Sequence, residues 1–94
     1  MGLKECKIIY NALSVSKKEK AIIFLKKLIT EEDKKRIRTA IFHDPKSWFA
    51  FYHHGWGTNI RNALRREKLG EEYFGINNLD DIYVELIEDV VIKE

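Results

Sequence analysis

The sequence predicts a single compact all-α domain of four to five short helices, spanning residues 1–94. Residues that break helices are sparse, because the chain has only one Pro and five Gly, and they divide it into helix-sized pieces. Within these pieces apolar residues recur three or four positions apart, and capping residues precede them. Hydrophobic residues make up 45% and charged residues 34% of the chain, which is typical of a folded globule.

The first half of the chain predicts three helices. Residues 3–13 carry apolar side chains at helical spacing, although residues 7–10 would also suit a strand. The pattern Ser16–Glu19 is a capping box that starts a second helix, which ends near Ile29. Thr30 is then the N-cap of a third helix with acidic residues in its first turn. We expect the second and third helices to form an antiparallel hairpin with a very short turn.

Asp44–Pro45 predicts the start of another helix. Asp is a favoured N-cap, and Pro at the first helical position gives up an N–H that would be unpaired there. Residues 48–52 would place aromatic side chains on this helix, and Gly55 and Gly57 would end it.

Two more helices complete the prediction. Thr58 or Asn59 would cap the first, which ends at Gly70. Asp80 would cap the last, over residues 82–92, where many β-branched residues make a strand the competing interpretation. The cap and the apolar spacing favour a helix. Its predicted buried stripe consists of Tyr83, Leu86, Ile87, Val90 and Val91.

The net charge of +2 conceals an asymmetry. Residues 1–70 contain sixteen Lys or Arg against seven Asp or Glu, a net charge of +9. Residues 71–94 contain one Lys against eight acids, a net charge of −7. A basic body and an acidic segment can pair within one fold, or they can present two faces of opposite sign to partners.

The sequence favours a cytoplasmic, soluble protein. Cys6 is the single cysteine, so no disulfide can form within the chain. The start of the chain lacks the apolar core and cleavage pattern of a signal peptide, and no apolar run approaches the ~20 residues that span a membrane.

Two short motifs carry a resemblance to a known family. Residues His53, Gly57 and 60–62 fit the pattern His-x3-Gly-x2-Ile-Arg-Asn, and residues 75–81 fit Gly-Ile-x3-Asp-Asp. Over about residues 16–92 the chain resembles an uncharacterised family of small bacterial proteins of unknown function with these motifs. The resemblance implies a fold and a set of positions, but no activity.

The chain departs from the family pattern at three places. Asn78-Leu79 stands where the family tends to have His-Pro, and Tyr83 stands where it tends to have Ser. Leu64-Arg65 stands in place of the Leu-Trp that often follows Ile-Arg-Asn.

The two motifs bring together polar residues with two possible roles. In the functional interpretation, a histidine, an arginine and an Asp pair form a site for a carboxylate or phosphate. In the structural interpretation, which we favour, the arginine bridges to one of the aspartates and ties the Ile-Arg-Asn helix to the last helix. This polar network consists of His53, Arg61, Asn62, Asp80 and Asp81.

Metal, cofactor and catalytic sites find little support in the sequence. His53 and His54 are adjacent, so on a helix they diverge by ~100° and chelate poorly. His43 is ten residues upstream, and His-Glu-x-x-His, a phosphate-binding loop and a catalytic triad pattern are absent. We therefore expect no metal, no cofactor and no enzymatic activity.

Aromatic and basic residues exceed what a core of this size needs. We expect a protein partner to dock on exposed aromatics of residues 48–56 and on a basic helix face. The alternative is an anion or nucleic-acid binder that uses the same basic face, with Trp56 stacking on a base. The candidate binding residues are Trp56, Arg61, Arg65, Arg66 and Lys68.

Overall fold

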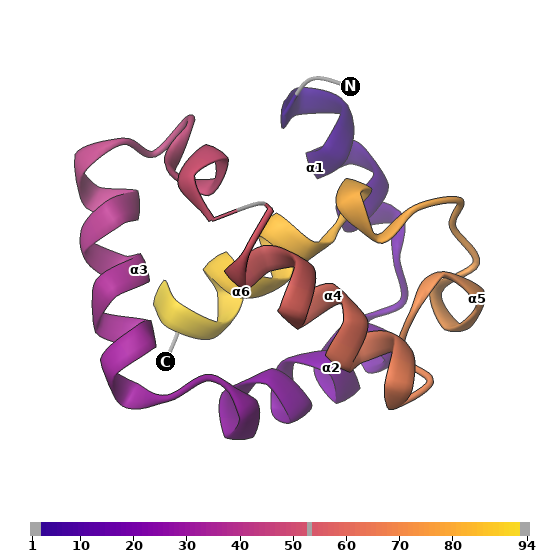
Figure 1. The fold of residues 1–94 in the computed structure, drawn as a ribbon. Coiled ribbons are helices and arrows are strands. Elements are labelled where there is room, and N and C mark those ends of the chain that lie inside the picture. Colours follow the sequence, from indigo (N-terminus) through magenta and orange to yellow (C-terminus); the bar gives the residue numbers. More distant parts are fainter. Residues whose placement is uncertain (1–2, 53, 93–94) are drawn as a thin grey trace.

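The last helix, α6 (Tyr83–Ile92), lies in the middle of the molecule, and the other helices surround it (Figure 1). Figure 1 shows the computed structural model, which describes residues 3–52 and 54–92; for residues 3–7 and 51 it describes the backbone alone. The radius of gyration is 12.2 Å, as expected of a compact chain of this length.

All regular structure in the described ranges is helical. Before α6 come the α-helices α1 (Leu3–Ala12), α2 (Val15–Leu28), α3 (Glu31–His43), α4 (Trp56–Arg66) and α5 (Glu71–Phe74), and the 3₁₀ helices η1 (Trp48–Phe51) and η2 (Leu79–Asp81). The predicted all-α class is confirmed, and both segments that could also have been strands are helices. The helices outnumber the prediction because α5 is a single turn in a stretch expected to be loop.

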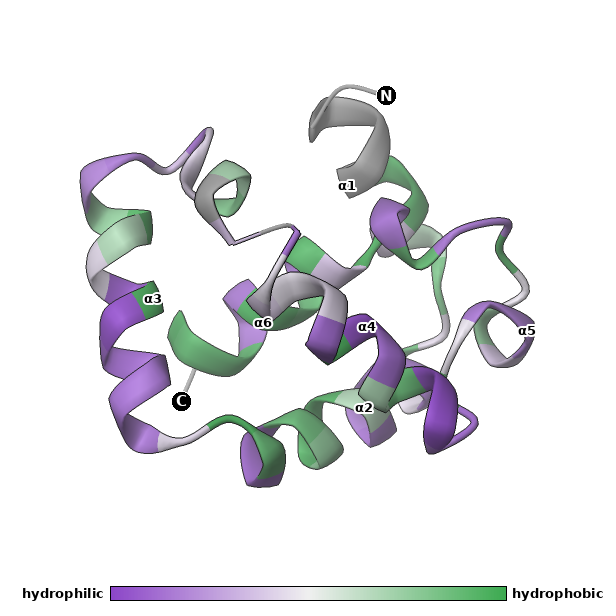
Figure 2. Ribbon diagram, viewed as in Figure 1, coloured by the Kyte–Doolittle hydropathy of each residue, from purple (hydrophilic) through white to green (hydrophobic). Residues whose placement is uncertain are grey.

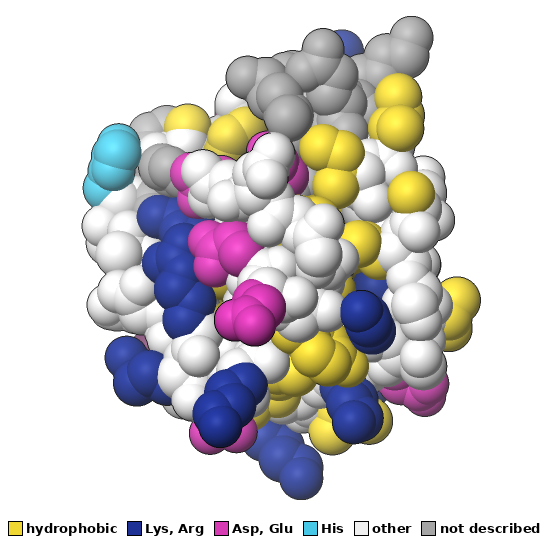
Figure 3. Space-filling model, turned by 90° about the vertical axis from the view of Figure 1, so that its right-hand side faces the viewer, with side chains coloured by type: hydrophobic (Ala, Val, Ile, Leu, Met, Phe, Trp, Pro, Cys, Tyr) yellow, Lys and Arg dark blue, Asp and Glu magenta, His cyan; other side chains and the backbone are white. Residues whose placement is uncertain are grey.

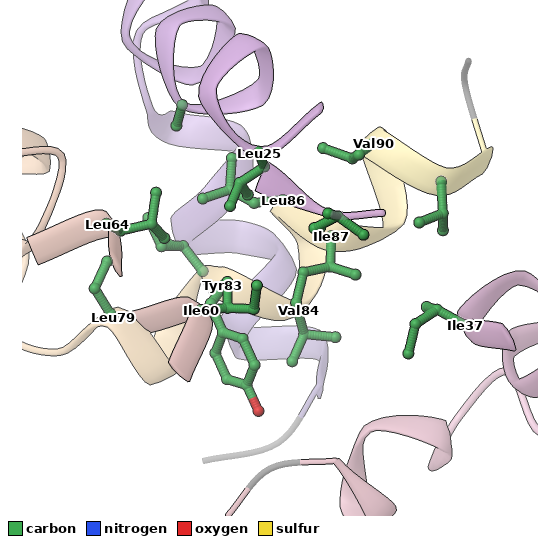
Figure 4. Packing of buried hydrophobic residues seen from close by; sticks show 14 of the residues in the cluster. Leu25, Ile37, Ile60, Leu64, Leu79, Tyr83, Val84, Leu86, Ile87 and Val90 are labelled. Carbon is green, nitrogen blue, oxygen red and sulfur yellow. The ribbon is translucent and has the colours of Figure 1, made fainter. Parts of the chain in front are cut away.

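The apolar character of α6 explains its central position. Its stripe of Tyr83, Leu86, Ile87, Val90 and Val91 is buried as predicted, and so are its neighbours Val84 and Glu85. A helix that is apolar on nearly every side is stable in water only when other elements cover it. Figure 2 shows α6 largely in the hydrophobic colour, whereas α3 and the end of α4 are mainly hydrophilic. Figure 4 shows Leu25 from α2, Ile37 from α3 and Leu64 from α4 directed towards α6.

The predicted hairpin of α2 and α3 is wrong. The two helices meet at a corner, and each packs on α6 instead of folding back along the other (Figure 1). Two residues, Ile29 and Thr30, connect them, and the buried Ile29 continues the apolar face of α2 into the core. Both helices bury apolar side chains against the central helix, which removes this apolar surface from water.

The predicted caps of α2 and α3 differ in outcome. Thr30 caps α3 as predicted, because its Oγ1 accepts a hydrogen bond from the Asp33 N–H at 3.1 Å. The cap predicted at Ser16 is wrong, because α2 begins at Val15 and Ser14 precedes it. Ser16 lies inside the first turn, where its hydroxyl contacts that of Ser14 at 2.9 Å.

Asp44 starts a turn and not the predicted α-helix. Its Oδ1 accepts from the Ser47 N–H at 3.3 Å, and η1 follows at once. The Trp48 indole is 1% exposed and donates to Glu88 Oε2 at 2.9 Å. The tight 3₁₀ turn therefore places the Trp48 side chain in the core. The predicted longer helix would have distributed the aromatic side chains around its circumference.

The caps predicted for α4 and α6 are also wrong. Because α4 begins at Trp56 after Gly55, the predicted caps Thr58 and Asn59 lie within its first turn. Asp80 lies in η2, where Asn78 Oδ1 accepts from the Asp80 N–H at 3.0 Å, and α6 begins only later. The Asp80 carboxylate instead pairs with a side chain of α4.

None of the described helices combines the length and the apolar character needed to cross a bilayer.

Candidate binding cleft

Gly57 lets α4 approach the rest of the fold closely. It was predicted to break a helix but is the second residue of α4. Its N–H donates to the Tyr52 carbonyl at 2.6 Å. A Cβ here would lie 2.9 Å from that carbonyl oxygen and 3.3 Å from the Tyr83 ring. The close approach, and not a turn, explains the glycine.

One turn further along α4, Arg61 joins three parts of the molecule. Its Nε lies 3.1 Å from Asp80 Oδ1 in η2, and its Nη2 donates to Thr58 Oγ1 at 2.9 Å. Its guanidinium carbon lies 4.6 Å from the centre of the Tyr83 ring in α6. In this junction of Arg61, Asp80 and Tyr83, Arg61 is 7% exposed and Tyr83 2%, whereas Asp80 reaches the surface. Burial raises the pKa of the Tyr83 hydroxyl, although the positive Arg61 opposes that rise.

The residues predicted to form the polar network are only partly brought together. Arg61 and Asp80 form an ion pair, and Asp81 lies half-buried beside Asp80 on η2. Asn62 is exposed and accepts from Arg65 Nη1 at 2.9 Å, on another side of α4. His53 lies outside the described residues.

Arg65, four residues after Arg61, forms a second arginine–carboxylate pair at the surface. Its Nε lies 3.1 Å from Glu71 Oε1, and its Nη2 lies 2.7 Å from Glu71 Oε2. Glu71 Oε2 also accepts from the Leu79 N–H at 3.2 Å. The fork of Arg65 therefore links the end of α4 to α5 and to the start of η2.

These contacts fix the charge of both partners. Hydrogen bonding from Arg65 is the main cause that lowers the pKa of Glu71 to about 2. The same hydrogen bond raises the pKa of Arg65. Both groups are therefore fully charged near neutral pH.

The surface pair lines an open cleft of about 720 Å³. The residues of this cleft are Arg65, Lys68, Gly70, Glu71, Glu72 and Tyr73. From α2, Lys17 reaches the same place, because its Nζ donates to the Tyr73 carbonyl at 2.8 Å and lies 5.4 Å from the centre of the Tyr73 ring. Figure 3 shows this side of the molecule, with acidic side chains near its centre and Lys and Arg around its lower part.

The predicted basic residues therefore have unequal roles. Arg61 is buried in the junction, whereas Arg65, Arg66 and Lys68 are exposed. Lys68 has a φ of 60°, a left-handed conformation that is uncommon for a residue with a side chain. It lies in the connection between α4 and α5, at the wall of the cleft.

The aromatic residues predicted to form a contact surface are only partly exposed where the structure describes their side chains. Trp48 is buried, and Phe49, Tyr52 and Trp56 are half-buried. Trp56 donates its indole N–H to Asp33 Oδ2 at 3.3 Å. Its ring packs edge-on against the Tyr52 ring, with the two ring centres 6.1 Å apart. These rings pack against the core and against one another, so they offer little surface to a partner or to a base.

The sequence interpretation missed three residues at the cleft and one elsewhere. Glu71 and Tyr73 come from a stretch expected to be loop, and Lys17 comes from the predicted capping box of the second helix. Phe42 is 83% exposed, whereas the sequence predicted exposed aromatics within residues 48–56. The helical spacing of α3 could have predicted this exposure, because Phe42 does not share the apolar face of Ile37 and Ile41.

Within the part of the chain that the structure describes, no three His, Cys, Asp or Glu side chains gather where they could hold a metal ion. Comparison of the chain with protein-family models, with curated proteins and with solved structures finds no match. The resemblance to the small bacterial family therefore stays a prediction.

Proposed function

We propose that the protein is a small non-enzymatic cytoplasmic protein that acts by binding a protein partner, and that the cleft beside Arg65 is its contact site. The observation that carries the proposal is the cleft itself, with an arginine, a lysine and a tyrosine in its wall. Arg and Tyr are enriched among the residues that dominate binding energy at protein interfaces.

The fixed geometry of Arg65 supports a binding role. Glu71 and Asn62 hold the guanidinium in place, so a partner group that contacts it meets a donor that is already ordered. Lys68 adds an exposed ammonium group at the same wall, and the Tyr73 ring adds apolar area. An interface segment with a carboxylate next to an apolar side chain would match this arrangement.

The charge states in the cleft argue for binding over catalysis. A general acid or base works best with a pKa near the working pH. Here the pKa of Glu71 is about 2 and that of Arg65 is raised, so both move away from neutrality. Such groups exchange protons poorly near neutral pH.

Affinity capture with paired variants tests the proposal. The double variant Lys68→Ala/Tyr73→Ala removes two side chains from the wall of the cleft and leaves the contacts of Arg61 unchanged. The control, Lys27→Ala/Lys46→Ala, removes two exposed lysines that do not line the cleft. A partner that wild type and control enrich alike, and that the cleft variant loses by tenfold or more, is the expected result. Equal enrichment by all three proteins contradicts the proposal.

Binding of a nucleic acid or another polyanion is the second candidate. Among the described residues, the exposed ones include ten Lys or Arg against six Asp or Glu, an excess of four positive charges. Of the seven described acids of residues 71–94, one is exposed, five are half-buried and one is buried, so the fully exposed surface is more basic than the net charge of +2 suggests. Binding of this kind weakens steeply with salt, whereas docking of a protein partner survives moderate salt. A gel shift at low and moderate salt separates the two candidates.

A further inference from the structure

Phe42 leaves a large apolar side chain uncovered on α3, far from the cleft. At 83% it has the highest exposure of any large hydrophobic residue in the described ranges. Its ring packs edge-on against the ring of the adjacent His43, with the two ring centres 5.6 Å apart. In Figure 1, α3 forms one edge of the molecule and α5 lies at the opposite edge, so this surface is separate from the proposed contact site.

A second exposed apolar residue lies near the same helix. Arg38, one turn before Phe42, donates from Nε to the Val91 carbonyl at 2.9 Å. The next residue, Ile92, is 55% exposed. The outer side of α3 therefore carries Phe42 at one end and is flanked by Ile92 near Arg38.

The charges on the outer side of α3 change sign along the helix. Glu31, Lys35, Arg38 and Phe42 follow the spacing i, i+4, i+7 and i+11, which places them on one face. Glu31, Glu32, Lys35 and Arg38 line a shallow hollow of about 350 Å³. The order from the start of the helix is two acids and then two cations.

A helix with this order of charges is complementary to its own antiparallel copy. When two such helices lie side by side about a two-fold axis near residue 34, Glu31 faces Arg38 of the second copy and Glu32 faces Lys35 of the second copy. The same axis repeats both pairs, because a two-fold interface uses one patch on both chains. Phe42, 83% exposed, then lies beyond the start of the second helix, where it can bury part of its ring against the second copy.

We propose that the outer face of α3, made of Glu31, Glu32, Lys35, Arg38 and Phe42, binds the same face of a second copy of this chain in an antiparallel arrangement. Exposed ion pairs contribute little each, and a single helix pair lies at the low end of interface sizes. We therefore expect a reversible dimer with a Kd of about 10–100 µM that weakens as salt screens the charges.

Sedimentation equilibrium with charge-reversal variants tests this dimer. Wild type should approach twice the monomer mass of 11.1 kDa as concentration rises. Glu31→Lys/Glu32→Lys makes the face wholly basic, and Lys35→Glu/Arg38→Glu makes it wholly acidic. Each variant alone should stay monomeric because like charges then oppose each other, and an equimolar mixture should form a heterodimer.

Two outcomes overturn the proposal. One is a wild type that stays monomeric up to about 1 mM, well above the expected Kd. The other is a dimer that persists in both reversal variants, which would place the contact elsewhere. Because the reversals alter the capping acids of α3, Phe42→Ser provides a second measurement that leaves the caps intact. It should weaken the dimer at least fivefold with an unchanged helix content, and an unchanged Kd contradicts the proposed face.

Discussion

Two arginines one helical turn apart on α4 form the same kind of ion pair in different surroundings. The Arg61 side chain is 9% exposed and its partner Asp80 41%, whereas the Arg65 side chain is 41% exposed and its partner Glu71 27%. Arg61 also lies against the Tyr83 ring of the central helix. Arg65 shares its carboxylate with a backbone N–H and borders solvent.

The difference shows that residue type and spacing do not decide what an arginine contributes. Removing one partner of a buried pair leaves a charge without compensation, which costs several kcal/mol, whereas exposed pairs contribute ~0–1 kcal/mol. We therefore expect Arg61 to matter for folding and Arg65 for binding.

Arg61→Ala should give the largest effect on stability. It removes the contacts to Asp80, Thr58 and Tyr83 together, and we expect the free energy of unfolding to fall by about 2–3 kcal/mol, since one partner is half exposed. Urea unfolding followed by circular dichroism measures it. An unchanged midpoint would show that the junction does not stabilise the fold.

Gly57→Ala should come next, because a Cβ at this position would press on the Tyr52 carbonyl and the Tyr83 ring. We expect a loss of about 1–3 kcal/mol, typical of overpacking. Gly55→Ala is the matched control, since a Cβ there meets nothing within 4 Å. Equal melting temperatures for the two variants would contradict the close approach of α4.

Acid should weaken the surface pair by a smaller amount. The pKa of Glu71 is about 2 in the folded protein against an ordinary value of 4.5. A lowered pKa means that the stabilisation is fully present above pH ~4.5 and is lost as the pH falls towards ~2. Because the pair is partly exposed, we expect about 1 kcal/mol. An NMR titration of the Glu71 carboxyl checks the pKa, and a midpoint near 4.5 would contradict it.

Arg65→Ala should have the smallest effect on stability, about 0.5 kcal/mol, because Glu71 keeps its hydrogen bond from the Leu79 N–H. The same substitution should raise the pKa of Glu71 towards its ordinary value. Thermal unfolding and the NMR titration measure the two effects. A stability loss as large as that of Arg61→Ala would remove the distinction between the pairs.

The sequence predicted the helical class and the apolar stripes better than the places where helices begin. The stripe of α6 and the inner face of α4 follow from periodicity, which burial reinforces along the whole element. The predicted caps at Ser16, Asp44 and Asp80 misled for different reasons. Ser16 lies inside the first turn of α2, and the Asp80 carboxylate pairs with Arg61. Asp44 accepts a local hydrogen bond in a turn, which Asp stabilises as readily as it caps a helix.

The packing partners could not be read from the sequence. A pairing of Arg61 with Asp80 or Asp81 was expected from two motifs, whereas that of Arg65 with Glu71 depends on the path between α4 and α5. That path turns on Lys68, a non-glycine residue in the left-handed region, which local propensity does not predict. Lys68 lies in the wall of the cleft, so the sequence revealed the basic residues of the cleft but not their setting.

The central position of α6 also sets the order in which the protein can become stable during synthesis. The ribosome makes α2, α3 and α4 before the helix on which their apolar faces pack. Until Tyr83–Ile92 has emerged, Leu25, Ile37 and Leu64 have no common core to enter. A nascent chain that stops before α6 therefore exposes three apolar helix faces, and such surfaces are what chaperones bind and what aggregation starts from.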